Sequence, residues 1–205
     1  RNFQGLLDYS ERDNLTGLLN RKTFDESFYK VSAAVSRSGA STASAAEAER
    51  RQVPAFGRYY IGVIDIDHFK TVNDVHGHLI GDEVLLLLSR LMRSNFRFHD
   101  RLYRFGGEEF VVLMRCGSDE AARVGFERLR ANVQGYKFPQ VGSITISVGY
   151  AAVQPGDTPS IAFARADKAV YWAKGHGRNQ VCNHADLLAD GEGVEVGKSG
   201  DVELF

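Results

Sequence analysis

The stretch Leu102–Met114, LYRFGGEEFVVLM, decides the fold. Two short apolar segments, 102–105 and 110–114, lie on either side of the Gly106-Gly107 pair. Strand-like segments around adjacent glycines predict a β-hairpin with a tight turn, and strands joined by such a turn pair in antiparallel fashion. The sequence therefore predicts antiparallel pairing at the centre of its sheet.

The segments outside the hairpin alternate between helical and strand-like patterns. The predicted order is a helix from about residue 21, a strand at 58–65, a helix at 81–96, the hairpin, a helix at 118–133, a strand at 143–153, a helix at 160–174 and a strand at 180–182. Helices that separate strands around a hairpin indicate an α+β layer of the split βαβ type. We expect a central, mostly antiparallel sheet of about five strands flanked by helices, in a ferredoxin-like arrangement.

The composition is that of an ordinary globular domain. The 205 residues carry 25 basic and 26 acidic side chains, a net charge of −1, and 43% of them are hydrophobic. These values argue against a nucleic-acid partner, which needs a basic surface. The longest aliphatic run, Val84–Leu88, is far shorter than the roughly 20 residues of a membrane-spanning helix, so no membrane segment is expected. Cys116 and Cys182 lie far apart without a CxxC partner, which favours reduced thiols in a cytoplasmic domain.

The chain is expected to contain one domain with extensions. Residues 1–12 are interpreted as the end of an upstream signalling helix, and residues 13–184 as the folded domain. A stretch rich in Ser, Ala and Gly at about 36–50 is interpreted as a flexible insertion or a poorly ordered helix extension. The Gly- and acid-rich residues 185–205 are expected to form a loose tail. Because the sequence begins at Arg1 rather than Met, we expect it to be part of a longer protein.

Acidic side chains gather at two places where they gain nothing for packing. Glu108 and Glu109 follow the glycines of the hairpin turn, where their charges repel each other and the glycines allow the backbone to approach a ligand closely. Asp65 and Asp67 end an apolar strand, and burying their charge is costly unless it is compensated. Mg²⁺ provides that compensation, because it binds one or two carboxylates, waters and substrate phosphates. The pattern favours a nucleoside triphosphate site, with a solvated acidic turn as the alternative.

Cationic and amide side chains follow the same elements. Lys70 comes directly after the acidic strand end, where a strand-to-helix turn can point amide groups at a phosphate. Lys174 and Arg178 end the last long helix, where simple capping of the helix dipole is the alternative. Asn73 and Asp82 carry donors and acceptors that match a guanine edge; the alternatives are a turn residue and a helix N-cap.

These motifs together resemble the GGDEF domain family, the catalytic domain of diguanylate cyclases, in its GGEEF version. The resemblance runs from Asp13 to about Cys182, and its motifs follow the order and spacing of the family. They are DNLTGLLNR at 13–21, DIDHFK at 65–70, NDVHGHLIGD at 73–82, RFGGEEF at 104–110, SVG at 147–149, AD at 166–167 and AKGHGRN at 173–179. The resemblance implies the palm-type fold of nucleotidyl cyclases.

The resemblance also implies a reaction, the condensation of two GTP into cyclic di-GMP and two pyrophosphates. Two domains face each other across a two-fold axis, and each ribose 3′-hydroxyl attacks the α-phosphate of the partner's GTP. Residues matching Asp65 and Glu108, with the carbonyl of Ile66, hold Mg²⁺ or Mn²⁺, two ions per active site. Glu108 is the first candidate for the group that deprotonates the hydroxyl, and Glu109 is the second.

Substrate contacts follow from the same resemblance. Lys70, Lys174 and Arg178 match phosphate contacts. Backbone amides near His68 and Phe69 match the cradle of the β- and γ-phosphates. We therefore expect the triphosphate to lie between the strand-to-helix turn and the end of the last long helix.

Two further motifs match ligand contacts. Asn73 and Asp82 match the guanine-reading pair, with His78 close by. Arg97 and Asp100, in the RFHD tetrapeptide nine residues before the glycine pair, match the inhibitory site for cyclic di-GMP. Arginine can fork onto a phosphate or guanine, and aspartate can accept from guanine. We expect feedback inhibition by the product, with a surface ion pair at a helix end as the alternative.

A GGDEF domain that binds GTP or cyclic di-GMP without cyclising it is the competing function. Receptors of this kind usually lose the acidic turn or the metal-binding aspartate, whereas Asp65, Glu108 and Glu109 are all present. We therefore expect an enzyme that acts as a homodimer in a cytoplasmic domain. It would belong to a larger bacterial protein, free or attached to a membrane, with an upstream sensor or dimerisation module.

Overall fold

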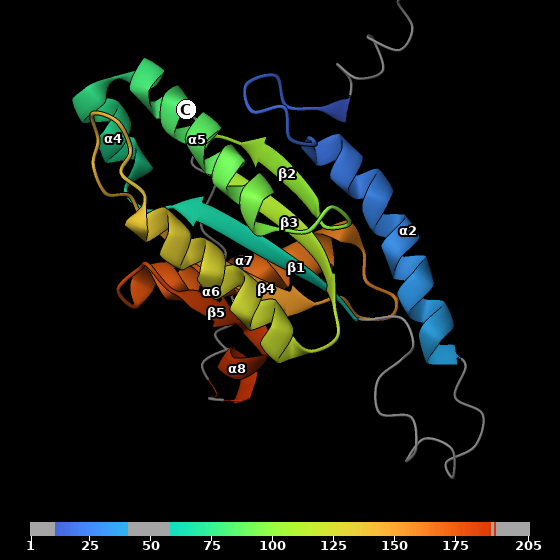
Figure 1. The fold of residues 1–205 in the computed structure, drawn as a ribbon. Coiled ribbons are helices and arrows are strands. Elements are labelled where there is room, and N and C mark those ends of the chain that lie inside the picture. Colours follow the sequence, from blue (N-terminus) through green and yellow to red (C-terminus); the bar gives the residue numbers. More distant parts are fainter. Residues whose placement is uncertain (1–10, 41–57, 190, 192–205) are drawn as a thin grey trace, which may run out of the picture.

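A five-stranded sheet forms the centre of the computed structural model, which describes residues 11–40, 58–189 and 191 (Figure 1). The strands are β1 (Arg58–Ile66), β2 (Arg101–Gly106), β3 (Glu109–Cys116), β4 (Ile146–Ala152) and β5 (Val181–Asn183). They lie side by side in the order β2-β3-β1-β4-β5. This order places β1, the strand that carries Asp65, at the centre of the sheet.

Antiparallel pairing dominates the sheet, as the hairpin sequence predicts. β2 pairs antiparallel with β3, and β1 pairs antiparallel with both β3 and β4, while β4 and β5 run parallel. A register shift between Arg104 and Gly106 marks an irregularity at the tip of the hairpin, where Gly107 has a φ of 51°. Glycine adopts this left-handed conformation at little cost. The predicted α+β fold with a mostly antiparallel sheet of five strands is confirmed.

Helices cover both faces of this sheet. They are α2 (Arg21–Ala40), α4 (Phe69–His76), α5 (His78–Asn95), α6 (Asp119–Gly135), α7 (Pro159–Gly175) and α8 (His184–Ala189). α5 and α6 pack on one face, and α2 and α7 pack on the other (Figure 1). Among the described residues, no helix combines the length and the apolar character needed to cross a membrane.

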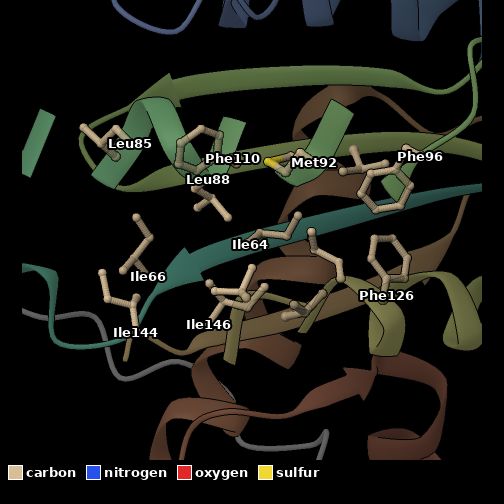
Figure 2. Packing of buried hydrophobic residues seen from close by; sticks show 14 of the residues in the cluster. Ile64, Ile66, Leu85, Leu88, Met92, Phe96, Phe110, Phe126, Ile144 and Ile146 are labelled. Carbon is tan, nitrogen blue, oxygen red and sulfur yellow. The ribbon is translucent and has the colours of Figure 1, made fainter. Parts of the chain in front are cut away.

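The central strand contributes to two hydrophobic cores, because alternate residues of a strand point to opposite faces. Tyr60, Ile64 and Ile66 join the core under α5 and α6, part of which is shown in Figure 2. Ile61 and Val63 join the core under α2 and α7. A strand that is buried on both faces has little room for charge. The acidic residues at its end therefore need compensation from their surroundings.

The structure differs from the sequence prediction at the start of α5. A single helix is predicted from Gly81, whereas two consecutive helices, α4 and α5, meet at Gly77, and α5 already begins at His78. Gly77 has a φ of 85°, a conformation that favours glycine and allows the chain to change direction. Only Phe69 and Val72 of α4 are buried, so the sequence carries too short an apolar pattern to reveal this helix.

The predicted extensions lie largely outside the described residues. Residues 1–10 and 192–205 are among those that the structure does not describe, as are residues 41–57, which include most of the predicted insertion. The first residues of that insertion belong to α2, which continues to Ala40. The structure also differs from the loose tail expected from Ala185, because α8 buries Leu187 against the domain.

A glycine in β4 provides a test of this packing. A Cβ at Gly149 would lie 2.2 Å from the carbonyl oxygen of Ala166 and 2.3 Å from the nitrogen of Val170, both backbone atoms of α7. Gly149→Ala is therefore expected to lower the free energy of unfolding in urea by about 2–3 kcal/mol. The control is Gly117→Ala, because a Cβ at Gly117 meets nothing within 4 Å. Equal stability of the two variants would contradict the packing of α7 on β4.

Candidate functional site

Three carboxylates meet where the central strand ends. In the antiparallel register of β1 and β3, Asp65 lies opposite Glu109, and Glu108 precedes Glu109 in the hairpin turn. The Asp65 side chain is 16% exposed, and both glutamates are partly buried. The structure thus brings together the two acidic groups that the sequence identifies, because the register of adjacent strands places them at the same edge of the sheet.

Lys174 lies within this acidic group. Its Nζ atom is 2.6 Å from Oδ1 of Asp65, and it projects from the last turn of α7. Within the part of the chain that the structure describes, Oδ1 of Asp65 is enclosed and accepts no well-directed hydrogen bond. Its close partner is therefore the ammonium group alone. The sequence resemblance assigns Lys174 to a phosphate, whereas here it pairs with a carboxylate.

The carboxyl groups of this cluster resist ionisation. Burial is the main cause that raises the pKa of Asp65, of Glu108 and of Glu109, and repulsion from the other acidic groups raises these pKa values further. Burial also raises the pKa of Asp167 on α7. Lys174 lowers all four pKa values without overcoming burial. Arg21 also lowers the pKa of Glu109, and together these two cations supply too little positive charge for the cluster.

These oxygen donors fit a divalent cation whose coordination shell a bound substrate completes. Among the described residues, the enclosed Oδ1 atom of Asp65 has the ammonium group of Lys174 as its one close partner, and Glu108 lies close enough to repel it. The side chain of Ile66 is buried in the core, so this residue can offer a cation only its backbone carbonyl. Across residues 11–40, 58–189 and 191, no three His, Cys, Asp or Glu side chains form a complete metal site. Mg²⁺ can bind at a site with so few protein ligands, since it takes further oxygens from water and phosphates.

The turn between β1 and α4 presents backbone amides next to the carboxylates. His68 precedes α4 with a φ of 58°, and its side chain makes no capping hydrogen bond. The first amide groups of a helix have no partner within the helix, so they remain available to an anion. Phe69 is buried in the core, whereas the side chain of Lys70 is exposed. His68 and Phe69 can therefore bind phosphate through their backbone and Lys70 through its ammonium group.

The segment after α7 is the second place suited to phosphate. Gly177, Arg178 and Asn179 have φ values of 107°, 61° and 46°. The amide of Arg178 donates to the carbonyl of Ala173 at 2.9 Å, which closes the end of the helix, while its side chain is exposed. The guanidinium group of Arg178 therefore projects from a well-defined turn near Lys174.

The predicted guanine-binding residues lie at the corner between α4 and α5. An ideal Cβ at Gly81 would lie 1.9 Å from Oδ1 of Asn73, so a larger residue at this position would displace the Asn73 side chain. Asp82 follows Gly81 and is exposed, as is His78. The N-cap of α5 is Gly77, so the alternative in which Asp82 caps this helix is wrong. Asn73 likewise lies in a helix and not in a turn.

The RFHD tetrapeptide forms a turn between α5 and β2. Oδ2 of Asp100 accepts the amide hydrogen of Arg97 at 2.9 Å, and its Oδ1 accepts that of Arg115 at 3.4 Å. Asp100 is buried and Arg97 is exposed. Among the described residues no ion pair joins the guanidinium of Arg97 to Asp100, so the predicted alternative of a surface ion pair is not formed.

Arg104 supports the acidic turn through contacts that the sequence motifs do not reveal. Its NH1 atom donates to both oxygens of Asp13, at 3.0 and 3.1 Å, and its NH2 atom donates to the carbonyl of Gly107 at 2.9 Å. Burial raises the pKa of Asp13, but hydrogen bonds from Thr16 and Arg104 outweigh it and hold that pKa below its usual value. An arginine directly upstream of an acidic glycine turn is the signal that could have identified this contact.

The raised pKa of Glu108 gives a stability test that needs no ligand. Above that pKa the ionised group costs the folded state stability, and below the unfolded pKa of about 4.3 this cost is absent. Glu108→Gln removes the charge, so its Tm relative to the parent is expected to rise between about pH 4 and pH 8. The measurement is thermal unfolding without divalent cations, with Glu26→Gln on the exposed face of α2 as the control. A difference in Tm that stays constant or falls with pH would contradict the unfavourable charge.

Known proteins resemble this chain in sequence over most of its length. The sequence model of the family described as "Diguanylate cyclase, GGDEF domain" matches residues 42–180. The chain is 40% identical over 172 residues to diguanylate cyclase DgcP of Pseudomonas aeruginosa, covering 82% of this chain and 23% of that protein. It is 45% identical over 130 residues to the response regulator PleD of Caulobacter vibrioides, covering 60% of this chain and 28% of that protein. The chain therefore spans less than a third of either relative.

The fold also matches solved structures. The crystal structure of the coiled coil and GGDEF domain of DgcB from Caulobacter crescentus, in complex with c-di-GMP, superposes with a TM-score of 0.75 at 26% identity. That superposition covers 89% of this chain and 90% of the other. Family match, sequence identity and fold agree with the motifs, and the chain belongs to the GGDEF domain family of diguanylate cyclases.

Proposed function

We propose that the chain is the catalytic domain of a diguanylate cyclase, which condenses two GTP into cyclic di-GMP and two pyrophosphates. The observation that carries the proposal is the acidic cluster around Asp65, which is short of positive charge and whose enclosed Oδ1 atom has only the ammonium group of Lys174 beside it among the described residues. A degenerate domain has no reason to keep so costly an arrangement. Because the chain belongs to the GGDEF family, we assign to this cluster the reaction of diguanylate cyclases.

Asp65, Glu108 and the carbonyl of Ile66 are the groups that would hold Mg²⁺ or Mn²⁺, two ions per site. Bound there with the substrate, such ions would polarise the α-phosphate and would make the 3′-hydroxyl a better nucleophile. Lys174 forms an ion pair with the carboxylate of Asp65 in the ligand-free chain. Because the cations would supply the charge that Asp65 needs, Lys174 would become available for a phosphate of the substrate.

The proton of the attacking hydroxyl needs an acceptor. Glu108 and Glu109 are the carboxylates of the hairpin turn, and burial is the main cause that raises the pKa of both in the ligand-free chain. In each transfer the 3′-oxygen forms a bond to the α-phosphorus, the bond to pyrophosphate breaks and the proton passes to the carboxylate. Glu108 is the first candidate, because it belongs to the metal-binding group as well, and Glu109 is the second.

The remaining site residues bind and orient GTP. The amides at His68 and Phe69, with Lys70, Lys174 and Arg178, hold the triphosphate. At the other end, Asn73 and Asp82, with His78 beside them, read the guanine edge. Holding both ends of the nucleotide fixes the α-phosphate between the carboxylates and the incoming hydroxyl.

The second nucleotide requires a second copy of the chain. Each described domain offers one acidic cluster, and the attacking hydroxyl belongs to the other GTP. Two domains related by a two-fold axis would place each 3′-hydroxyl opposite the partner's α-phosphate. Specific activity should therefore rise with protein concentration.

Removing the metal-binding carboxylate tests the reaction. Asp65→Asn is expected to lower the rate of cyclic di-GMP formation from GTP and Mg²⁺ by at least about 100-fold, because the cations lose their charged ligand. Product is measured by chromatography at several protein concentrations, with Glu120→Gln on the exposed start of α6 as the control. A parent protein that makes no product at any concentration, even when it is dimerised artificially, would exclude the cyclase. If that protein still bound GTP or cyclic di-GMP, it would be a receptor.

Product inhibition tests the second predicted site. The exposed guanidinium of Arg97 stands on a turn that Asp100 already holds through backbone contacts, so its removal should leave the turn intact. Arg97→Ala is expected to weaken inhibition by cyclic di-GMP at least about tenfold, the effect of losing one charged hydrogen bond, without changing the initial rate. Arg90→Ala on α5 is the control. Unchanged inhibition in Arg97→Ala would rule out this site.

A further inference from the structure

Asp67 is a buried carboxylate that the proposed chemistry leaves unused. It is 5% exposed and follows the last residue of β1. Its Oδ1 atom accepts the hydroxyl of Ser147 at 2.6 Å, and its Oδ2 atom accepts the hydroxyl of Thr145 at 2.7 Å. Oδ2 also accepts the amide of Asn179 at 3.0 Å, and the Asp67 amide donates to the carbonyl of Thr145 at 2.9 Å. Both carboxylate oxygens are therefore bound within the protein.

The environment of Asp67 differs from that of its neighbour Asp65. Among the described residues, the enclosed Oδ1 atom of Asp65 has only the ammonium group of Lys174 beside it, whereas Asp67 has three donors aimed at its two oxygens. A metal ion at Asp67 would have to displace these donors and leave them unsatisfied in the interior. The carboxylate is built to hold protein groups and not a cation.

Asp67 connects the two segments proposed to bind phosphate. On one side it precedes His68, and on the other it holds the amide of Asn179, which follows Arg178. All three of these neighbours have left-handed backbone conformations, with φ values of 58°, 46° and 61°. Such conformations cost about 1–3 kcal/mol each and persist only where the surroundings enforce them. One buried carboxylate thus fixes two strained turns relative to each other.

We propose that Asp67 is a positioning residue that holds the Arg178 segment against the turn at His68–Lys70 and so determines the affinity for the triphosphate part of the substrate. The inference rests on the proposed function, because it assumes that these two segments bind phosphates. It adds to the site a residue that does not touch the substrate and acts only by holding the segments that do.

The nucleoside end of the site should be independent of Asp67. Asn73 and Asp82 depend on the contact between α4 and α5 at Gly81. No hydrogen bond of Asp67 reaches those residues. The inference therefore predicts a selective loss, in which a guanosine triphosphate binds less well and a guanosine monophosphate does not.

The Arg178 segment has a second support, which keeps an Asp67 variant folded. NH1 of Arg130 on α6 donates to Oδ1 of Asn179 at 2.9 Å. The side chain of Gln180 donates to the carbonyls of Ala173 and His176 at 2.9 and 2.7 Å. Loss of Asp67 should therefore loosen the backbone at Asn179 without detaching the segment.

The test compares two nucleotides in two variants. The probes are 3′-deoxy-GTP, which cannot cyclise, and GMP, each with Mg²⁺ and measured by calorimetry. Asp67→Ala is expected to raise the Kd of 3′-deoxy-GTP at least about tenfold and that of GMP less than about twofold. Asp67→Asn should stay within about threefold of the parent for both, since an amide oxygen accepts from Asn179 and Thr145 and its NH₂ group donates to Ser147.

A matched control separates positioning from a general loss of stability. Asp157 is also a buried aspartate, bound to Arg165 near the start of α7, so Asp157→Ala should lower Tm and leave both nucleotide affinities unchanged. In the ligand-free protein, hydrogen exchange at the amide of Asn179 should accelerate in Asp67→Ala and not in Asp67→Asn.

Three results would overturn the inference. The first is an equal loss of both nucleotides in Asp67→Ala, and the second is unchanged exchange at Asn179. The third is a loss of Mg²⁺-dependent binding in Asp67→Asn as large as in Asp65→Asn, which would make Asp67 a metal ligand. A parent protein that binds GTP but forms no cyclic di-GMP would refute the cyclase and leave the positioning role standing. A parent that binds no GTP would refute both.

Discussion

The register between β1 and β3 is the constraint on which the site depends. It sets Asp65 directly opposite Glu109, at the one end of the central strand where charge enters an otherwise apolar environment. Like charges opposite each other weaken a sheet, and burial here raises the pKa of both groups. Among the described residues, the ammonium group of Lys174 pairs with Asp65, and the positive charge of Arg21 acts on Glu109. A sheet edge that is poorly neutralised by the protein alone is suited to ligands that bring their own cations.

Contacts from outside the sheet support the hairpin that carries Glu108 and Glu109. Arg104 binds the carbonyl of Gly107 and the carboxylate of Asp13 with the same guanidinium group. The amide of Arg104 also donates to the carbonyl of Leu19, so the N-terminal segment is joined to the hairpin by backbone as well as side chains. The position of the glutamates thus depends on residues far upstream of the turn, and not on the hairpin alone.

Local sequence patterns predicted those parts of the fold and site whose causes are local. Adjacent glycines between apolar segments predicted the hairpin, and an acidic end on an apolar strand predicted the cluster around Asp65. The break at Gly77 was missed, because α4 buries too few residues to show a helical pattern. The contacts of Asp67 with Asn179 and of Arg104 with Asp13 join residues 112 and 91 positions apart. Such pairs meet only through the order of the strands, which no local pattern contains.

Asp65 and Asp67 show why residue type alone does not assign a role. Both are aspartates at the end of the same strand, two positions apart, and successive odd positions of a strand point to the same face. Their partners differ, because β1 ends at Ile66 and the chain turns at Asp67. Asp65 remains in the sheet, where the charged groups nearest to it are carboxylates and Lys174, and Asp67 enters a ring of hydroxyl and amide donors from Thr145, Ser147 and Asn179. A carboxylate surrounded by like charge attracts a cation, whereas a carboxylate surrounded by donors holds protein segments in place.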